Sequence, residues 1–111
     1  MPPPVLVLTT VSSEEDGLRI ARILIGERLA ACVSMVPGLI SVYRWEGKIR
    51  EEREVLLLIK TSGESVDALI QRLSEVHPYS LPEIIAFRSD CVLEEYEKWV
   101  SSEVHGTPGG D

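Results

Sequence analysis

A long β-hairpin between Ala30 and Thr61 constrains the fold more than any other feature of the sequence. Two runs rich in β-branched and aromatic residues flank Glu46-Gly47, and a glycine that accepts a positive φ suits a two-residue hairpin turn. Each arm then has about 14 residues, which corresponds to about 46 Å of strand. A globule of about 100 residues is only about 35 Å across. The hairpin is therefore predicted to project from its domain.

A projecting pair of strands leaves backbone groups without partners and exposes the side chains of Tyr43 and Trp45. Such a surface is unstable in water unless another chain covers it. We therefore expect obligate association with further copies, with Tyr43 and Trp45 as anchors in that interface. The same two rings could instead form the aromatic wall of a pocket.

The composition describes one acidic domain. The chain has 111 residues and a net charge of −7, which argues against nucleic acid or an anionic membrane as a partner. Its two cysteines, Cys32 and Cys91, lie far apart without zinc-type spacing, so we expect reduced thiols. No basic, apolar leader and no long apolar run is present, so neither a signal peptide nor a membrane span is predicted. The expected location is the cytoplasm.

Periodicity predicts the elements around the hairpin. A β-branched run at 5–11 predicts a buried strand, and residues 83–88 predict a last, short one. Helical spacing predicts three helices, over 14–29, from 61 or 62 to 76, and from 90 to about 103, with Ser12 and Asp90 as N-caps of the first and third. The second helix ends at His77-Pro78, since the residue before proline leaves the α region. A single domain over residues 1–103 is expected, followed by a disordered tail over 104–111.

This order of elements, βαββαβ with a terminal helix, favours one architecture. Right-handed crossovers place both crossover helices on one face of a four-stranded antiparallel sheet. The sequence predicts the α+β class, as a ferredoxin-like βαββαβ sandwich with a long protruding β-hairpin and an extra C-terminal helix. A phosphate-hydrolysing enzyme on this fold would need a glycine-rich loop after the first strand, where Ser12-Ser13-Glu14 stands. A copper chaperone would need CxxC, which is absent, so we expect a non-enzymatic protein.

Five short motifs occur in order along the chain: Leu29-Ala30-Ala31-Cys32, Val36-Pro37-Gly38, Tyr43-Arg44-Trp45-Glu46-Gly47-Lys48, Leu58-Ile59-Lys60-Thr61 and His77-Pro78-Tyr79-Ser80-Leu81-Pro82-Glu83. Together they resemble the CutA divalent-cation-tolerance family over residues 5 to about 103. The resemblance implies a ferredoxin-like subunit in a tight homotrimer whose hairpins clasp their neighbours. It also implies a link to tolerance of copper and other divalent metals, and a distant architectural similarity to PII signalling proteins.

The chain departs from some members of that family at residues associated with copper. Those members resemble one another in a cysteine at the end of the first strand and a second histidine before His-Pro-Tyr, where this chain has Thr9 and Val76. Only His77 remains of that set, so we expect weak binding of copper or another divalent cation, with His77 and Cys32 as candidate metal ligands. His77 could instead cap a helix C-terminus, and Cys32 could be a small core residue.

Two functions remain open from the sequence. The first is divalent metal (copper) ion binding and metal tolerance by a compact homotrimer. The alternative is a PII-like sensor or scaffold that binds a small ligand in a cleft between subunits, for which Lys60, Tyr79, Glu83 and Tyr43 are the candidates. Lys60 and Glu83 could equally pair with each other. The charged run 50–54 is expected to be solvated and to form interchain ion pairs, or to collect cations loosely.

Overall fold

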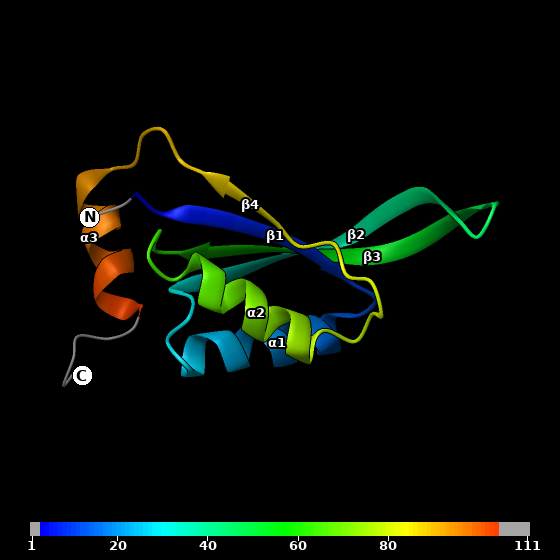
Figure 1. The fold of residues 1–111 in the computed structure, drawn as a ribbon, viewed down its shortest axis with the longest axis horizontal. Coiled ribbons are helices and arrows are strands. Elements are labelled where there is room, and N and C mark those ends of the chain that lie inside the picture. The colour runs from blue at the N-terminus through cyan, green and yellow to red at the C-terminus, as the bar shows by residue number, and fades with distance from the viewer. Residues whose placement is uncertain (1–2, 105–111) are drawn as a thin grey trace.

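The computed structural model describes residues 3–104. Its elements follow the predicted order (Figure 1): β1 (Val5–Val11), α1 (Glu14–Gly26), β2 (Cys32–Trp45), β3 (Lys48–Thr61), α2 (Val66–Val76), β4 (Ile85–Arg88) and α3 (Glu94–Glu103). The predicted disordered tail lies outside the described residues, apart from Val104. No helix in the described part of the chain is long and apolar enough to cross a membrane.

The four strands form one antiparallel sheet in the order β2-β3-β1-β4. Helices α1 and α2 lie side by side on one face of it, and α3 lies at the end far from the hairpin tip (Figure 1). Strand order and helix placement are those of the ferredoxin-like α+β sandwich, so the predicted fold class is confirmed.

The hairpin of β2 and β3 projects from this sandwich as expected (Figure 1). The described residues extend over 48 × 27 × 22 Å, which is much longer than a compact globule of this size. Both turn residues have positive φ, 52° at Glu46 and 78° at Gly47, as a type I′ turn requires. The register shifts between Val36 and Leu39, which marks a β-bulge at Pro37-Gly38, with Gly38 at φ 81°.

The hydrophobic core lies between the sheet and the two crossover helices. Alternate residues of the central strands point into it, because successive side chains of a strand face opposite sides. Val7, Val11, Leu57 and Ile59 of the sheet are fully buried there. They pack against α1 and α2, which contribute the buried residues Ile20, Leu24, Leu69 and Leu73.

The first helix begins at Glu14 as predicted, but the predicted N-cap and the predicted C-terminal end were wrong. Ser13 rather than Ser12 is the N-cap, and its Oγ accepts a hydrogen bond from Asp16 N at 3.1 Å. The helix stops at Gly26 instead of residue 29, because Arg28 takes a left-handed φ of 60° and the Arg28 and Leu29 amides bond back to Ile25 O and Leu24 O. This is a Schellman C-cap, in which an apolar residue beyond the helix continues the helical spacing.

Other element boundaries also differ from the predicted ones. Strand β4 begins at Ile85 rather than residue 83, because its ladder with β1 ends at the Leu8–Ile85 pair. Helix α3 has Leu93 as its N-cap without a side-chain hydrogen bond, so the prediction for Asp90 was wrong. Helix α2 follows Ser65 rather than Thr61 or Ser62, and it ends before His77 as predicted.

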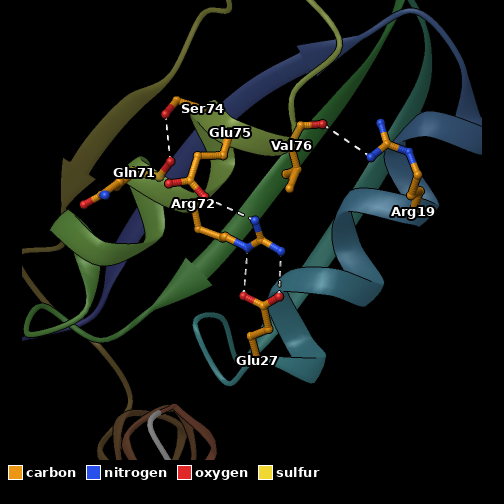
Figure 2. Close-up of polar contacts among 7 residues, drawn as sticks. All are labelled: Arg19, Glu27, Gln71, Arg72, Ser74, Glu75 and Val76. Atoms are coloured by element: carbon orange, nitrogen blue, oxygen red, sulfur yellow. Dashed lines mark hydrogen bonds and ion pairs between the residues drawn. The ribbon is translucent and has the colours of Figure 1, made fainter.

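Charged side chains join the two crossover helices on the solvent side (Figure 2). Arg72 of α2 forms a two-pronged ion pair with Glu27, with both N–O distances 2.9 Å, and a third contact to Glu75. Arg19 of α1 donates to Val76 O at the end of α2, at 3.3 Å. These contacts fix how α2 ends and therefore where the following segment, residues 77–84, begins.

Two glycines of α1 should respond in opposite ways to alanine. A Cβ at Gly17 would lie 2.9 Å from Met35 Sδ and 3.1 Å from Leu57 Cδ2, whereas one at Gly26 would meet nothing within 4 Å. We expect Gly17→Ala to lower the free energy of unfolding by about 1–3 kcal/mol through overpacking. Gly26→Ala should raise it by up to about 1 kcal/mol through helix propensity. Urea denaturation at equal protein concentration measures both, and a more stable Gly17→Ala would contradict the packing described here.

Candidate functional site

The sheet has an open face, which we define as the side away from α1 and α2. It carries the even-numbered residues of β1 and β3 and their cross-strand partners. Many of these side chains are apolar and only partly buried in the single chain, among them Leu6, Leu8, Leu56 and Leu58. Val36, Ile85 and Phe87 on the same face are 42–47% exposed. A contiguous apolar surface of this kind is typical of a protein interface.

The arm, which we define as residues 39–54, continues this face beyond the sandwich. Strand β3 pairs with β1 only from Val55 onward, so the arm consists of two strands alone. Tyr43 and Trp45 lie on its open-face side and are 42% and 39% exposed. Its other side carries Ile40, Val42 and Ile49, which are 56–67% exposed. The sequence reasoning missed these three, although their alternation with polar residues could have shown them.

A concavity of about 780 Å³ lies where the arm meets the segment 77–84. Tyr43, Tyr79 and Glu83, three of the four residues predicted to line a cleft, line it together with Trp45, Arg50 and Glu54. Lys60, the fourth, does not line it and lies near the opposite end of β3. There Lys60 Nζ donates to Ser34 Oγ at 2.6 Å and to Leu58 O at 3.2 Å. No ion pair joins Lys60 to Glu83 within residues 3–104.

One wall of the concavity is held by a bond between a phenol and a carboxylate. Tyr79 Oη donates to Glu54 Oε2 at 2.7 Å, and Glu54 is only 9% exposed. Burial raises the pKa of Tyr79 far above its ordinary value, and the Glu54 carboxylate raises it further. Tyr79 therefore remains a neutral donor, which ties the segment 77–84 to β3.

His77 is buried behind this wall with both ring nitrogens occupied. Its Nδ1 accepts from Tyr79 N at 3.2 Å, so the proton of the neutral ring belongs on Nε2. Nε2 lies 3.0 Å from both Thr10 O and Thr9 Oγ1 of β1. Burial lowers the pKa of His77 below its ordinary value near 6.5, although the bond to Thr10 O opposes the shift. A metal ion could bind this imidazole only by replacing one of these bonds.

The two predicted metal ligands lie apart in one chain. Cys32 is half-buried and pairs across the sheet with Lys60, which pairs with Leu6, whereas His77 contacts Thr9 and Thr10. Cys32 and Thr9 lie two strands apart and are offset by three residues along the strands. Their distance is therefore about 14 Å. The described residues contain no group of three or more His, Cys, Asp or Glu side chains that could hold a metal ion. Metal ligation by His77 and Cys32 stays a prediction.

The fold and this surface define a class of protein: ferredoxin-like α+β subunits with a projecting hairpin. The sequence matches the family described as CutA1 divalent ion tolerance protein over residues 5–103. The chain therefore belongs to the CutA1 family, and the resemblance noted in the sequence is confirmed.

Relatives and solved structures agree with this assignment. The divalent-cation tolerance protein CutA of Thermus thermophilus is 47% identical over 95 residues, which cover 86% of this chain and 92% of the relative. The chloroplastic protein CutA 1 of Oryza sativa is 42% identical over 100 residues, which cover 90% of this chain and 56% of the relative. The crystal structure of CutA from Xylella fastidiosa superposes with a TM-score of 0.90 at 44% identity, and the match covers 92% of this chain and 98% of that one.

The environment of His77 predicts an acid-sensitive fold. Because burial lowers its pKa, the unfolded chain takes up a proton at a higher pH than the folded chain does. The free energy of unfolding should therefore fall as the pH drops through about 6.5 towards the lower folded pKa. Gln at position 77 can still donate to Thr10 O but does not titrate. The free energy of unfolding of His77→Gln should therefore decline less between pH 7.5 and 5.5 than that of the wild type. Parallel stability profiles for the two proteins would contradict this.

Proposed function

We propose that the protein is a homotrimer that binds divalent cations, copper among them, and acts in metal tolerance. The observation that carries the assembly is the open face and the arm that extends it. A free hairpin of two strands is marginally stable, and this one also presents aromatic and aliphatic side chains on both of its sides. Further copies of the chain are the partner that is always present to cover them. The family resemblance supplies the number three.

The cation-binding part of the proposal is supported by the names of the family and of the relatives, and by the charge of the chain. The family name and the names of the relatives refer to divalent cations. The chain carries a net charge of −7, and carboxylates such as Glu52, Glu54 and Glu83 line the concavity. A site with His77 or Cys32 would need ligands from more than one chain, because one chain keeps these two apart. Assembly is thus a precondition for a chelating site in this proposal.

The proposal describes a non-enzymatic protein of the cytoplasm. Two free cysteines, Cys32 and Cys91, suit a reducing compartment. Hydrogen bonds with Thr9 Oγ1, Thr10 O and Tyr79 N occupy both ring nitrogens of His77, so neither is free to act as a base on a substrate.

A small-ligand sensor or scaffold is the second candidate function. One observation favours it: the structure brings Tyr43, Tyr79 and Glu83 together at a concavity of about 780 Å³. This volume is within the usual range of small-molecule sites, about 300–1,000 Å³. The concavity also continues into the open face, so a neighbouring copy would complete its walls.

The assembly should be visible in solution. Light scattering is expected to give a mass three times the 12.3 kDa of the chain at micromolar concentration. Because association and folding are coupled, the melting temperature should rise with protein concentration. Trp45→Ala should lower that temperature through lost interface packing, whereas Thr107→Ala in the C-terminal tail should not. A folded monomer would refute the trimer, and an unchanged melting temperature would show that Trp45 is not an anchor.

Copper binding should be weak and should depend on imidazole. We expect a Kd of about micromolar or weaker, because the suspected ligands at Thr9 and Val76 are missing and the imidazole must exchange a hydrogen bond. Protonated imidazole cannot bind a metal, and burial lowers the pKa of His77, so affinity should weaken as the pH falls from about 6.5 towards that lower pKa.

Isothermal titration of the wild type and His77→Ala with Cu(II), at pH 7.5 and 5.5, measures both effects. Light scattering of each variant confirms that the compared proteins have the same assembly state. Equal affinities would remove His77 from the site. Nanomolar affinity of the wild type would mean that the assembled chains create ligands that one chain does not show.

A further inference from the structure

The open face carries opposite charges at the two ends of β3. Glu54, Leu56, Leu58 and Lys60 alternate along this strand, so their side chains all point to the open side of the sheet. Glu54 lies at the root of the arm, and Lys60 lies at the other end of the strand. The strand rises by about 20 Å from residue 54 to residue 60. The two charges therefore cannot reach each other within one chain.

Glu54 is a nearly buried carboxylate without a cation beside it. It is 9% exposed, and within residues 3–104 its carboxylate accepts one hydrogen bond, from the neutral Tyr79 Oη. Arg50 and Arg53 line the same concavity, but neither forms an ion pair with Glu54. A carboxylate that has been removed from water is unfavourable unless a cation compensates for it. Glu54 thus lacks a partner that another chain can supply.

Lys60 is a half-buried ammonium group without a carboxylate beside it. Its Nζ donates only to neutral acceptors, Ser34 Oγ at 2.6 Å and Leu58 O at 3.2 Å. No ion pair joins it to any residue of the described range. Outside residues 39–53, the described strands place no charged side chain on the open face other than Glu54 and Lys60. The open face of the sandwich is therefore an apolar strip with one charge of each sign.

We propose that the Lys60 ammonium group of one copy pairs with the Glu54 carboxylate of the next copy, beside Tyr79. The contact joins two different patches, so each chain offers one patch to each of two neighbours. Head-to-tail contacts of this kind can close into a ring, as a trimer requires. The inference rests on the proposed assembly and names the residues that join its chains. The concavity beside Tyr79 is then incomplete in one chain and is completed by a neighbour's Lys60.

Two other carboxylates of the concavity, Glu52 and Glu83, fit this role less well. Both are exposed, so water already solvates them, and an exposed ion pair contributes little to stability. Glu54 gains more from a cation because little water reaches it. The apolar residues Leu56 and Leu58 between the two charges also favour one register, because copies that meet out of register place a charge against an apolar side chain.

Zero-length cross-linking of the purified full-length protein tests the proposal. A carbodiimide joins a carboxylate to an amine only where the two groups are in direct contact, and mass spectrometry of the digested protein identifies the joined residues. We expect a cross-link between Glu54 and Lys60, which can join only two chains because one chain keeps them about 20 Å apart. It should be absent from Glu54→Gln, whose amide oxygen can still accept the bond from Tyr79. A cross-link from Lys60 to Glu52 or Glu83 in place of Glu54 would overturn the proposal.

A double-mutant cycle measures how strongly the two side chains are coupled. Sedimentation equilibrium, at a fixed urea concentration at which the wild type dissociates measurably, gives the protein concentration at half association. Glu54→Gln and Lys60→Gln should each raise this concentration about tenfold or more, because each leaves the other charge unpaired. The double variant should associate more tightly than the product of the two single effects predicts. Glu52→Gln is the matched control, and its effect should combine additively with that of Lys60→Gln.

The outcomes separate the ion pair from the assembly itself. Additive effects of Glu54→Gln and Lys60→Gln in a protein that is still a trimer would overturn the pair and leave the trimer intact. A wild type that remains a folded monomer would refute the proposed assembly and the pair together. A wild-type dimer that carries the Glu54–Lys60 cross-link would support the pair and refute the trimer, because two copies can form the same contact twice.

Discussion

Strand β3 is the element on which the rest of the structure depends. Its second half, from Val55 to Thr61, pairs on both edges, with β2 and β1, and contributes Leu57 and Ile59 to the core. Its first half, from Lys48 to Glu54, pairs with β2 alone and has no helix behind it. The same strand therefore holds the domain together and carries the arm away from it. Every surface that we connect with function lies on this strand or beside it.

The projecting hairpin could be predicted because it depends on length and local turn chemistry. A strand of 14 residues is longer than the domain is wide, and both β2 and β3 have this length. Glu46 and Gly47 take the positive φ values of a two-residue turn. Helix α2 could also be predicted, from its 3.6-residue period. The end of α1 could not, because Leu29 continues the apolar spacing of the helix although it belongs to the C-cap.

The site was predicted only in part, because its members meet through tertiary structure. Tyr43 and Tyr79 are far apart in sequence, and the end of α2 decides where Tyr79 lies. Lys60 belongs to one of the five short motifs, as the other candidates do, but strand direction puts it at the far end of β3 from the arm. The hydrogen bonds that occupy both nitrogens of His77 come from β1 and from its own chain segment. The family resemblance and the residue type therefore suggested a metal ligand where the single chain has a buried, hydrogen-bonded imidazole.

The central claim is that other copies of the chain cover the arm. Amide hydrogen exchange over residues 39–48, measured by mass spectrometry at micromolar concentration, tests it most directly, because a solvent-exposed two-stranded ribbon opens easily. The account predicts that these amides exchange about as slowly as those of the core strand β1, and faster upon dilution below the association range. Rapid exchange of the arm at all concentrations, with β1 still protected, would contradict it.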